Sequence, residues 1–329
     1  MKAALLYGVN DLRLVDVPVP VAGPGDVLVR VTCCGVCPTD LRKFRTGDAG
    51  SLKLPMNLGH EWVGEVVEVG REVSDFQVGI KTIGDTYDGY AEYALITAAT
   101  RQLSFPHGPF YVPDRVPDGD CTFVEPLADC LHAVIDQGQV QPGQIVLIFG
   151  AGQMGLQLAA VAKRQGARVI VSEPMAARRE YARRFGADVV FDPSVQDVVE
   201  EARAQGNGDG VDCAILSVGV PSLVNQALEI VRPLGRVVLF AGFERPAAAQ
   251  IDPNLIHYKE LIVVGSEWIG TPPYHRAELY QQAIDLIANG SIPVGDLIAS
   301  RFPLERIQEA FAAAQDPTVY KVIVCDAVR

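Results

Sequence analysis

Four side chains in this 329-residue sequence are of the types that bind zinc in catalytic sites. Cys37 follows a strand-like stretch, His60 and Glu61 are adjacent, and Glu125 precedes a proline. Zinc accepts sulfur, nitrogen and oxygen ligands, and a catalytic site uses three of them and leaves a fourth position open. Ligands so widely separated suit a site that the tertiary structure assembles, unlike the paired Cys-x-x-Cys spacing of small structural zinc modules. Such a site would supply Lewis-acid chemistry.

Each of these residues also has a purely structural interpretation. Cys37 could be one more buried thiol, with Cys33 and Cys34 beside it. Glu61 could be an ordinary ion-pair partner, and Glu125 could accept a hydrogen bond from a backbone N–H group. Composition and spacing do not bring the four side chains together in space, so both interpretations stay open at this level.

A glycine-rich turn at residues 150–155 carries a second chemical signal, the pattern Gly-x-Gly-x-x-Gly. It lies between an apolar run and a helical pattern, and a second apolar run ends at Glu173, at about the 20-residue spacing of dinucleotide-binding units. A plain glycine turn is the alternative. In a dinucleotide site, Gly150 permits the tight turn, Gly152 lets a pyrophosphate approach the backbone, and Gly155 lets the helix lie close to the strand. The helix N-terminus then faces the phosphates.

Glu173 also indicates which dinucleotide is bound. Its carboxylate can accept hydrogen bonds from both ribose hydroxyls of NAD, whereas its charge would repel a 2′-phosphate. Arg178 and Arg179 follow shortly and could soften that repulsion. The sequence therefore favours NAD over NADP.

The bulk composition limits the class of protein. Hydrophobic residues make up 49% and charged residues 21%, as in soluble globular proteins, and the length allows two domains. The net charge of −12 disfavours a nucleic acid or an anionic membrane as partner. No apolar run approaches the ~18 residues of a spanning helix, and the first residues lack the apolar core of a signal peptide. Seven cysteines, an odd number, indicate thiols or metal ligands in a reducing compartment. We expect a cytoplasmic enzyme.

The elements that must position these residues change in type along the chain. Residues 1 to about 125 are rich in short strands and turns, which predicts an all-β or barrel-like domain. From there to residue 268, strand and helix patterns alternate, which predicts a doubly wound parallel sheet. The expected strands are 145–149, 169–172, 189–191, 211–216, 237–241 and 261–265, after a helix at 127–135 and with helices at 155–165, 176–185, 195–204 and 222–231 between them.

The last sixty residues or so no longer fit that alternation. A helix at 276–288, a strand at 300–303, a helix at 307–314 and a strand at 321–325 are expected there. We assign them to the first domain, so that the nucleotide-binding domain is inserted within it.

Four motifs together resemble the zinc-dependent medium-chain dehydrogenases of the alcohol dehydrogenase superfamily, most of all the polyol and threonine dehydrogenase-like branch. They are Gly-x-Cys-x-Thr-Asp at 35–40, Gly-His-Glu-x-x-Gly-x-Val at 59–66, Glu-Pro-Leu-Ala at 125–128 and the glycine turn at 150–155. The resemblance covers nearly the whole chain. It implies an α/β protein with a GroES-like β-barrel catalytic domain at 1–125 and 269–329. An inserted Rossmann domain would occupy 126–268.

The resemblance also assigns roles to residues. It implies that Cys37 and His60 bind zinc, that Glu61 is a third ligand, and that Glu125 binds the metal directly or through water. Thr39 would accept the proton of the alcohol. The residues implied to bind the cofactor NAD are Gly150, Gly152, Gln153, Met154, Gly155, Glu173 and Arg178.

Two departures from the family pattern qualify these roles. The stretch 79–92 has no cysteine, where members with a second, structural zinc carry four, so we expect a single catalytic zinc. Many members place a relay histidine two or three residues after the Thr-Asp pair, and this chain offers Arg42 and Lys43. Asp40 is expected to be structural and to orient His60, and Lys321 to lie near the cofactor.

The implied activity is hydride transfer between NAD(H) and a secondary alcohol or ketone. Two carboxylates in the cleft favour a polyol, cyclitol, sugar or amino alcohol as substrate. The family resemblance also implies a homo-oligomer, either a dimer or a tetramer. One alternative is a zinc-free quinone or enoyl reductase that uses NADPH. Another is a dinucleotide-binding protein without catalysis.

Overall fold

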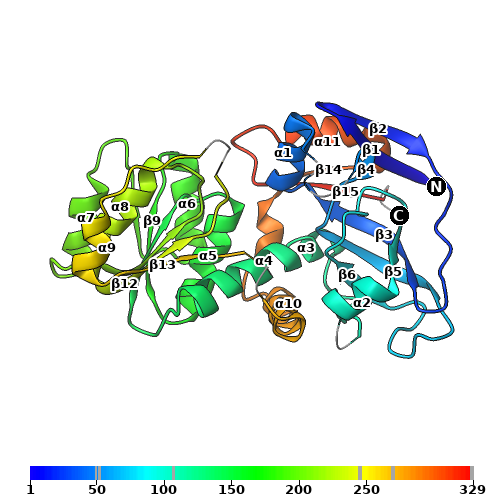
Figure 1. Cartoon of the computed structure of the whole chain (residues 1–329), viewed down its shortest axis with the longest axis horizontal. Helices are drawn as coiled ribbons and strands as arrows, with labels where there is room; N and C mark the ends of the chain where they lie inside the picture. Colours follow the sequence, from blue (N-terminus) through cyan, green and yellow to red (C-terminus); the bar gives the residue numbers. More distant parts are fainter. Residues whose placement is uncertain (49, 51–52, 106–107, 244–246, 268–270, 327–329) are drawn as a thin grey trace. The chain divides into compact units, whose positions relative to one another are not determined.

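The computed structural model describes the chain except residues 49, 51–52, 106–107, 244–246, 268–270 and 327–329. The chain forms two compact units. Residues 1–128 and 272–329 make up the first unit, and residues 129–271 make up the second (Figure 1). The expected joins, at 125/126 and 268/269, lie close to these limits, although the second falls outside the described residues.

The first unit is built on two β-sheets. The larger has the order β14-β15-β3-β5-β6, with β7 also paired to β3, and the smaller has the order β2-β1-β4. The strands are β1 (Lys2–Gly8), β2 (Asp11–Asp16), β3 (Val27–Gly35), β4 (Met56–Asn57), β5 (Trp62–Val69), β6 (Lys81–Gly84), β7 (Tyr93–Ile96), β14 (Ile298–Phe302) and β15 (Lys321–Cys325). Strand β15 lies between β14 and β3, so the C-terminal segment completes the N-terminal sheet, as expected.

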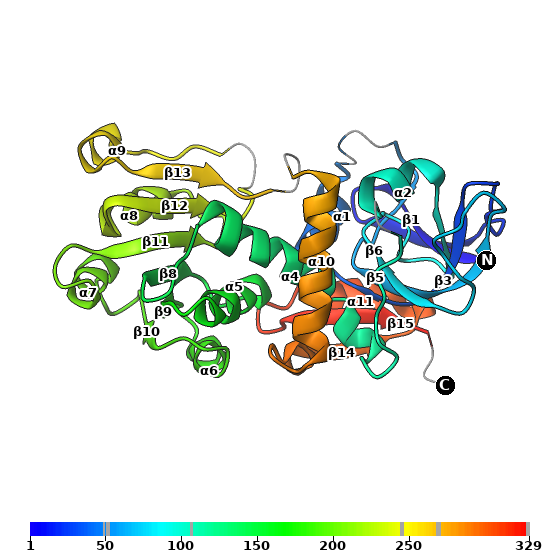
Figure 2. The same ribbon diagram turned by 90° about the horizontal axis from the view of Figure 1, so that it is seen from below.

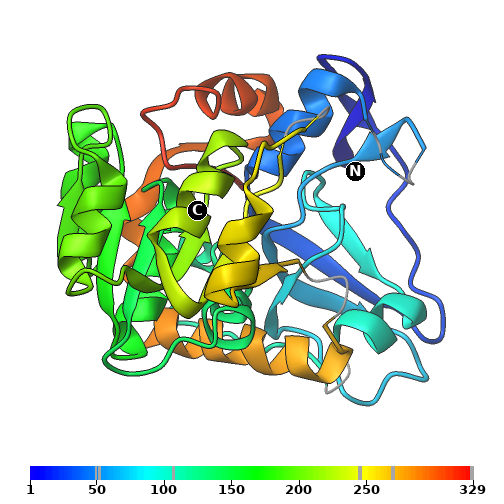
Figure 3. The same cartoon turned by 60° about the vertical axis from the view of Figure 1, so that its left-hand side comes forward.

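Short helices connect these strands. They are α1 (Pro38–Thr46), α2 (Ala98–Ser104), α3 (Asp118–Cys121), α10 (Pro273–Ala288), the 3-10 turns η3 (Val294–Leu297) and η4 (Leu304–Arg306), and α11 (Ile307–Ala313). Helix α1 lies beside β1, where the Asn10 N–H donates to the carbonyl of Phe44 at 2.8 Å (Figure 3). Helix α4 (Val124–Leu131) and the π-helical turn η1 (His132–Gln137) follow α3, where a single helix at 127–135 was expected.

One expectation about the cysteines is wrong. Cys33 in β3 faces Cys325 in β15 directly in the antiparallel register, with the two Cα atoms 4.0 Å apart, and the two sulfurs form a disulfide. The strand register, which is not visible in the spacing of the cysteines, brings together residues that are 292 positions apart. The cysteines outside this disulfide are Cys34, Cys37, Cys121, Cys130 and Cys213.

The second unit is a six-stranded parallel sheet with the order β10-β9-β8-β11-β12-β13 (Figure 2). Its strands are β8 (Ile145–Phe149), β9 (Arg168–Ser172), β10 (Val189–Phe191), β11 (Val211–Leu216), β12 (Val231–Leu239) and β13 (Ile262–Gly265). Its helices are α5 (Gln153–Arg164), α6 (Ala176–Arg184), α7 (Val198–Gln205), α8 (Ser222–Ile230) and α9 (Pro253–Lys259). The predicted doubly wound sheet is therefore confirmed.

Two boundaries in this unit differ from expectation for local reasons. Helix α7 begins three residues later than predicted because the carboxylate of Asp197 accepts the N–H groups of Val199 and Glu200, at 2.8 and 3.2 Å, and so caps the helix. Strand β12 begins earlier, at Val231, because that residue pairs with Val211 at the start of β11.

The strand order places the glycine turn at the carboxyl edge of the sheet. Strand β8 lies between β9 and β11, so the connections on its two sides run in opposite directions. Ligands bind α/β sheets at such a switch point, outside the carboxyl ends of the strands. No helix among the described residues is long and apolar enough to cross a membrane.

Candidate metal centre and dinucleotide site

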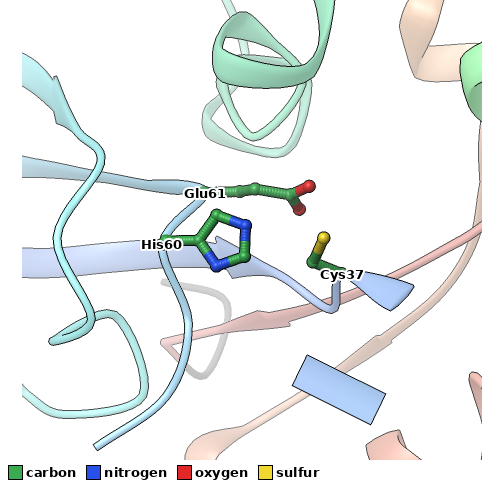
Figure 4. Close-up of side chains that lie close together, drawn as sticks. All are labelled: Cys37, His60 and Glu61. Carbon is green, nitrogen blue, oxygen red and sulfur yellow. The ribbon is translucent and has the colours of Figure 1, made fainter. Parts of the chain in front are cut away.

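Three of the predicted ligands converge in the first unit. One ligand atom each from Cys37, His60 and Glu61 lies within 4.8 Å of the other two. Figure 4 shows the sulfur, a ring nitrogen and the carboxylate turned toward one another. Cys37 follows the end of β3, and Glu61 immediately precedes β5. Because β3 and β5 are antiparallel neighbours, the end of one and the start of the other share an edge of the sheet.

Asp40 contacts the backbone on both sides of this group, at Cys37 and at Gly59. It is fully buried, and its carboxylate accepts the N–H groups of Cys37 and Gly59, both at 3.3 Å, and the hydroxyl of Tyr90 at 2.9 Å. It also lies 3.5 Å from Nδ1 of His60. Although burial opposes ionisation, the charge of His60 and these hydrogen bonds lower the pKa of Asp40. Its predicted structural role is consistent with these contacts.

The electrostatics of the group suit a divalent cation. Burial, and then the charge of Glu61, raise the pKa of the Cys37 thiol. Burial opposes protonation of His60, but the charges of Cys37 and Asp40 raise its pKa well above the usual value. Zinc binds sulfur and imidazole ligands in their deprotonated forms, so a zinc ion at this group would compete with protons for the thiol and the imidazole.

The sequence did not reveal the partner of Glu61. The Lys321 ammonium at the start of β15 makes an ion pair with the Glu61 carboxylate, and neither side chain is more than 1% exposed. The same ammonium lies 5.3 Å from the centre of the Phe123 ring. Burial acts to lower the pKa of Lys321, but the charge of Glu61 raises it. A lysine that opens an apolar strand was the only signal in the sequence.

Glu125, the fourth predicted ligand, lies outside this group of three. It is in α4, and burial raises its pKa to about 7, with the charges of Glu61 and Asp85 adding to the effect and that of His60 opposing it. The Glu125 carboxyl is thus close enough to His60 and Glu61 for their charges to shift its pKa. Thr39 is half-buried in the first turn of α1.

Tyr87 is a further neighbour of the group that the sequence did not predict. Its ring packs edge-on against the His60 ring, with the centroids 5.1 Å apart. The ammonium of Lys43 lies over the Tyr87 ring, 5.1 Å from its centre. No motif singles out Tyr87, which lies in the cysteine-free stretch after β6.

The predicted dinucleotide residues gather at the carboxyl edge of the second unit's sheet. Gly150 has φ of 95°, a left-handed conformation that favours glycine. A Cβ on Gly155 would lie 2.1 Å from the Gly150 carbonyl oxygen, so only glycine lets α5 start so close to β8. Gly152 precedes the first residue of α5 in an extended conformation. The N-terminus of α5 thus faces the ligand side of the turn.

Glu173 is held by the backbone at the end of β9. Its carboxylate accepts the N–H groups of Ala151 and Met175, at 2.8 and 2.9 Å, and the residue is 4% exposed. Arg178 in α6 lies on the same side, with Nη1 3.8 Å from the position of a Cβ on Gly152. An acid and a base therefore lie together where the adenine-side ribose of a dinucleotide would bind.

Gln153 and Met154 form the first turn of α5. Gln153 is 7% exposed, and its amide lies 3.6 Å from the sulfur of Met154. The carbonyl of Met154 accepts a weak hydrogen bond from the Cys130 thiol at 3.6 Å. These contacts fix the backbone at the start of the helix.

Comparisons with known proteins agree with this arrangement. Residues 23–104 match the alcohol dehydrogenase GroES-like domain, and residues 152–289 match the zinc-binding dehydrogenase family. L-threonine 3-dehydrogenase from Pyrococcus abyssi is 33% identical over 356 aligned residues, which cover 98% of this chain and 97% of the relative. (R,R)-butanediol dehydrogenase from Neisseria gonorrhoeae is 31% identical, covering 93% of each.

Solved structures show the same fold. A zinc-binding dehydrogenase from Sinorhizobium meliloti, bound to NADP, has a TM-score of 0.86 and 32% identity, with 98% of each chain covered. 2R,3R-butanediol dehydrogenase from Bacillus subtilis has a TM-score of 0.86 and 27% identity, with 99% of each chain covered.

Proposed function

Because the chain belongs to the zinc-binding alcohol dehydrogenase family, and is thus an alcohol-dehydrogenase-type oxidoreductase, we propose that it transfers a hydride between a secondary alcohol and NAD with one zinc ion per chain. The convergence of Cys37, His60 and Glu61 within 4.8 Å is the observation that carries the proposal. Neither alternative function, a zinc-free reductase or a non-catalytic dinucleotide-binding protein, requires these three side chains to lie together.

Cys37 and His60 would hold the zinc ion, with Glu61 or Glu125 as a further ligand. A sulfur, a nitrogen and a carboxylate oxygen are a set that zinc accepts. When bound, zinc supplies a Lewis acid that lowers the pKa of an alcohol hydroxyl. The proposal of a single zinc is supported by the absence of cysteine between residues 79 and 92.

The protein's own residues would do the remaining work. Asp40 holds the backbone of Cys37 and of Gly59, the residue before His60. Lys321 keeps the Glu61 carboxylate beside the other two ligands. Thr39, in the first turn of α1, would accept the proton that the alcohol gives up and pass its own hydroxyl proton on along a relay to solvent. The removal of the alcohol proton leaves the oxygen with the charge that drives hydride loss from the carbinol carbon.

NAD is favoured as the hydride acceptor because the Glu173 carboxylate is buried and held by two backbone N–H groups. A carboxylate fixed in this position accepts ribose hydroxyls and repels a 2′-phosphate. Arg178 lies nearby and works in the opposite direction, and the Sinorhizobium meliloti relative was solved with NADP. The ratio of the activities with NAD and with NADP is therefore part of the test below.

The substrate class that we propose is a polyol, cyclitol, sugar or amino alcohol. Relatives named as threonine, butanediol and sorbitol dehydrogenases support this class. The carboxyls of Glu61 and Glu125 make the surroundings of the ligand group acidic and polar, which suits a substrate with several hydroxyls.

The test is a panel of alcohols assayed with NAD and with NADP. The absorbance of NADH or NADPH monitors turnover, and mass spectrometry measures the zinc content. We expect about one zinc per chain, turnover of alcohols of the proposed class, and loss of turnover on chelation that zinc restores. Full activity in metal-free protein would favour the zinc-free reductase. Binding of NADH without turnover of any alcohol, with zinc supplied, would favour the non-catalytic protein.

A further inference from the structure

We propose that Lys43 and Tyr87 form a subsite for an anionic group of the substrate, so that the enzyme acts on secondary alcohols that carry a carboxylate or a phosphate. The proposal rests on the dehydrogenase function above and narrows its substrate class.

Lys43 is an unusually buried lysine. It lies in α1, the helix that begins directly after Cys37, and is 8% exposed. Lysine is almost never fully buried unless it is paired, because removing its ammonium from water is costly. The Lys43 ammonium lies over the face of the Tyr87 ring, 5.1 Å from the centroid, and 3.9 Å from the position of a Cβ on Gly50. A ring face stabilises a cation less than a paired carboxylate does in the same surroundings.

Tyr87 connects Lys43 to the ligand group. Its ring also packs edge-on against His60, with centroids 5.1 Å apart. The same ring therefore contacts both a predicted metal ligand and the Lys43 ammonium. A substrate whose hydroxyl lies at the ligand group would have to extend along Tyr87 to reach Lys43.

Three acidic residues around the group are engaged with other partners. The Glu61 carboxylate pairs with Lys321, and Asp85 lies 3.8 Å from Arg276. Asp40 is held by two backbone N–H groups and by the Tyr90 hydroxyl. Within the described part of the chain, no carboxylate lies within ion-pair distance of Lys43. An anion brought by the substrate would supply the missing partner.

The chemistry of a lysine suits this role. Its ammonium is a compact charge with three donors and binds carboxylate and phosphate oxygens without the planar geometry that arginine requires. The Tyr87 hydroxyl can contribute a further donor at the same place. The shared feature of the ligand is therefore an anionic oxygen group, and the two sources of it can be separated by experiment.

The experiment uses substrate pairs that differ in the anionic group. The zinc-loaded enzyme is assayed with 3-hydroxybutanoate against 1,3-butanediol, threonine against 1-amino-2-propanol, and arabitol phosphate against arabitol. We expect a preference for the anionic member of at least one pair, and the pair that shows it identifies carboxylate or phosphate. The substitution Lys43→Gln should lower that kcat/KM ratio about 10- to 100-fold, mainly through KM, as expected for a lost charge-assisted hydrogen bond. Lys43→Arg should retain most of the preference.

Arg42→Gln is the matched control, since Arg42 lies on the exposed side of the same helix and should leave the ratio unchanged. A wild-type preference, in every pair, for the member without the carboxylate or phosphate would overturn the subsite, and so would a ratio that Lys43→Gln does not change.

A binding measurement separates this proposal from the proposed function. Inorganic phosphate is titrated calorimetrically into zinc-loaded wild-type protein and into Lys43→Gln. Weaker binding to the variant supports the subsite even if no alcohol is oxidised, a result that would count against the dehydrogenase function alone. Equal binding to both proteins overturns the subsite whatever the activity, and circular dichroism verifies that the variant is folded.

Discussion

The ammonium of Lys321 and the carboxylate of Glu61 form an ion pair in which neither side chain is more than 1% exposed. One partner comes from the last strand of the chain and the other from the start of β5. A pair removed from water in this way is costly to break, because either partner alone is a buried charge. The pair therefore links the closure of the first unit's sheet to the position of a predicted zinc ligand.

Removal of Lys321 should destabilise the protein strongly. Lys321→Met leaves the Glu61 charge buried without its partner, and we expect a loss of about 3–5 kcal/mol in the free energy of unfolding. Lys321→Arg should lose less. The control is Lys163→Met, since Lys163 pairs with Asp188 at the surface, where both side chains are at least 32% exposed and an ion pair contributes about 1 kcal/mol or less. Urea denaturation measures both, and equal losses would contradict the structural role of the pair.

Replacement of Cys37 should separate metal binding from dinucleotide binding. Cys37→Ser removes the sulfur ligand, so we expect nearly complete loss of zinc and of turnover, with NADH affinity close to that of the wild type. Cys121→Ser is the control, because the Cys121 thiol donates to the Pro117 carbonyl, which a serine can also do. Mass spectrometry and NADH fluorescence provide the readouts. A Cys37→Ser protein with full zinc and full activity would show that the assigned ligand set is wrong.

The zinc-free protein should become less stable between about pH 4.5 and pH 7. Burial raises the Glu125 pKa from 4.5 to about 7, so in this range the folded protein holds a proton that the unfolded chain has released. The unfolded state then binds fewer protons, and stability falls as pH rises. The part of this fall that belongs to Glu125 is on the order of 3 kcal/mol, and Glu125→Gln should remove that part. Urea titrations of chelated protein at several pH values measure it.

Asp188 serves as the control for this prediction, because its pKa is shifted in the direction opposite to that of Glu125. Against the effect of burial, hydrogen bonds from Lys163 and from the Val169 N–H lower its pKa below 3.8. Its contribution to stability is present above that value and is lost as the solution is acidified. Asp188→Asn should therefore leave the slope between pH 4.5 and 7 unchanged. A slope that is as steep in Glu125→Gln as in the wild type would exclude this carboxyl as a source.

Substitution of Glu173 should change the dinucleotide preference. Glu173→Ser removes the acceptor for the ribose hydroxyls, and we expect NADH to bind about 10- to 100-fold more weakly. NADPH should be affected less, because the charge that repels its 2′-phosphate is also removed and Arg178 remains. Glu180→Gln, on the exposed side of α6, is the control. Fluorescence titration with both cofactors tests this, and an unchanged ratio of the two affinities would contradict it.

The edge strand β13 should mediate self-association. It is hydrogen-bonded to β12 on one side, and Ile262 and Val263 are 43% and 37% exposed. An exposed apolar edge strand is a template for pairing with another chain. We propose that a second copy pairs there and that Val263→Lys shifts the protein toward monomer in sedimentation velocity. Val195→Lys, at another exposed valine of the same unit, should not. A wild-type protein that is monomeric at micromolar concentration would contradict the proposal.

The sequence by itself determined the elements and the candidate residues of this protein. Glycines at 150, 152 and 155, an acid after the next strand and a run of alternating strands and helices specify the parallel sheet, because their conformational requirements are local. The residue types of Cys37, His60 and Glu61 also indicated a set of ligands that zinc accepts.

The tertiary structure alone decided which side chains meet. Strand register brought Cys33 to Cys325 and Lys321 to Glu61, and the spacing of residues along the chain contains no information about such pairings. It also left Glu125 outside the group of three and brought Lys43 to Tyr87. Contacts between residues far apart in sequence depend on the packing of whole sheets, so only the folded chain determines the charges around the site.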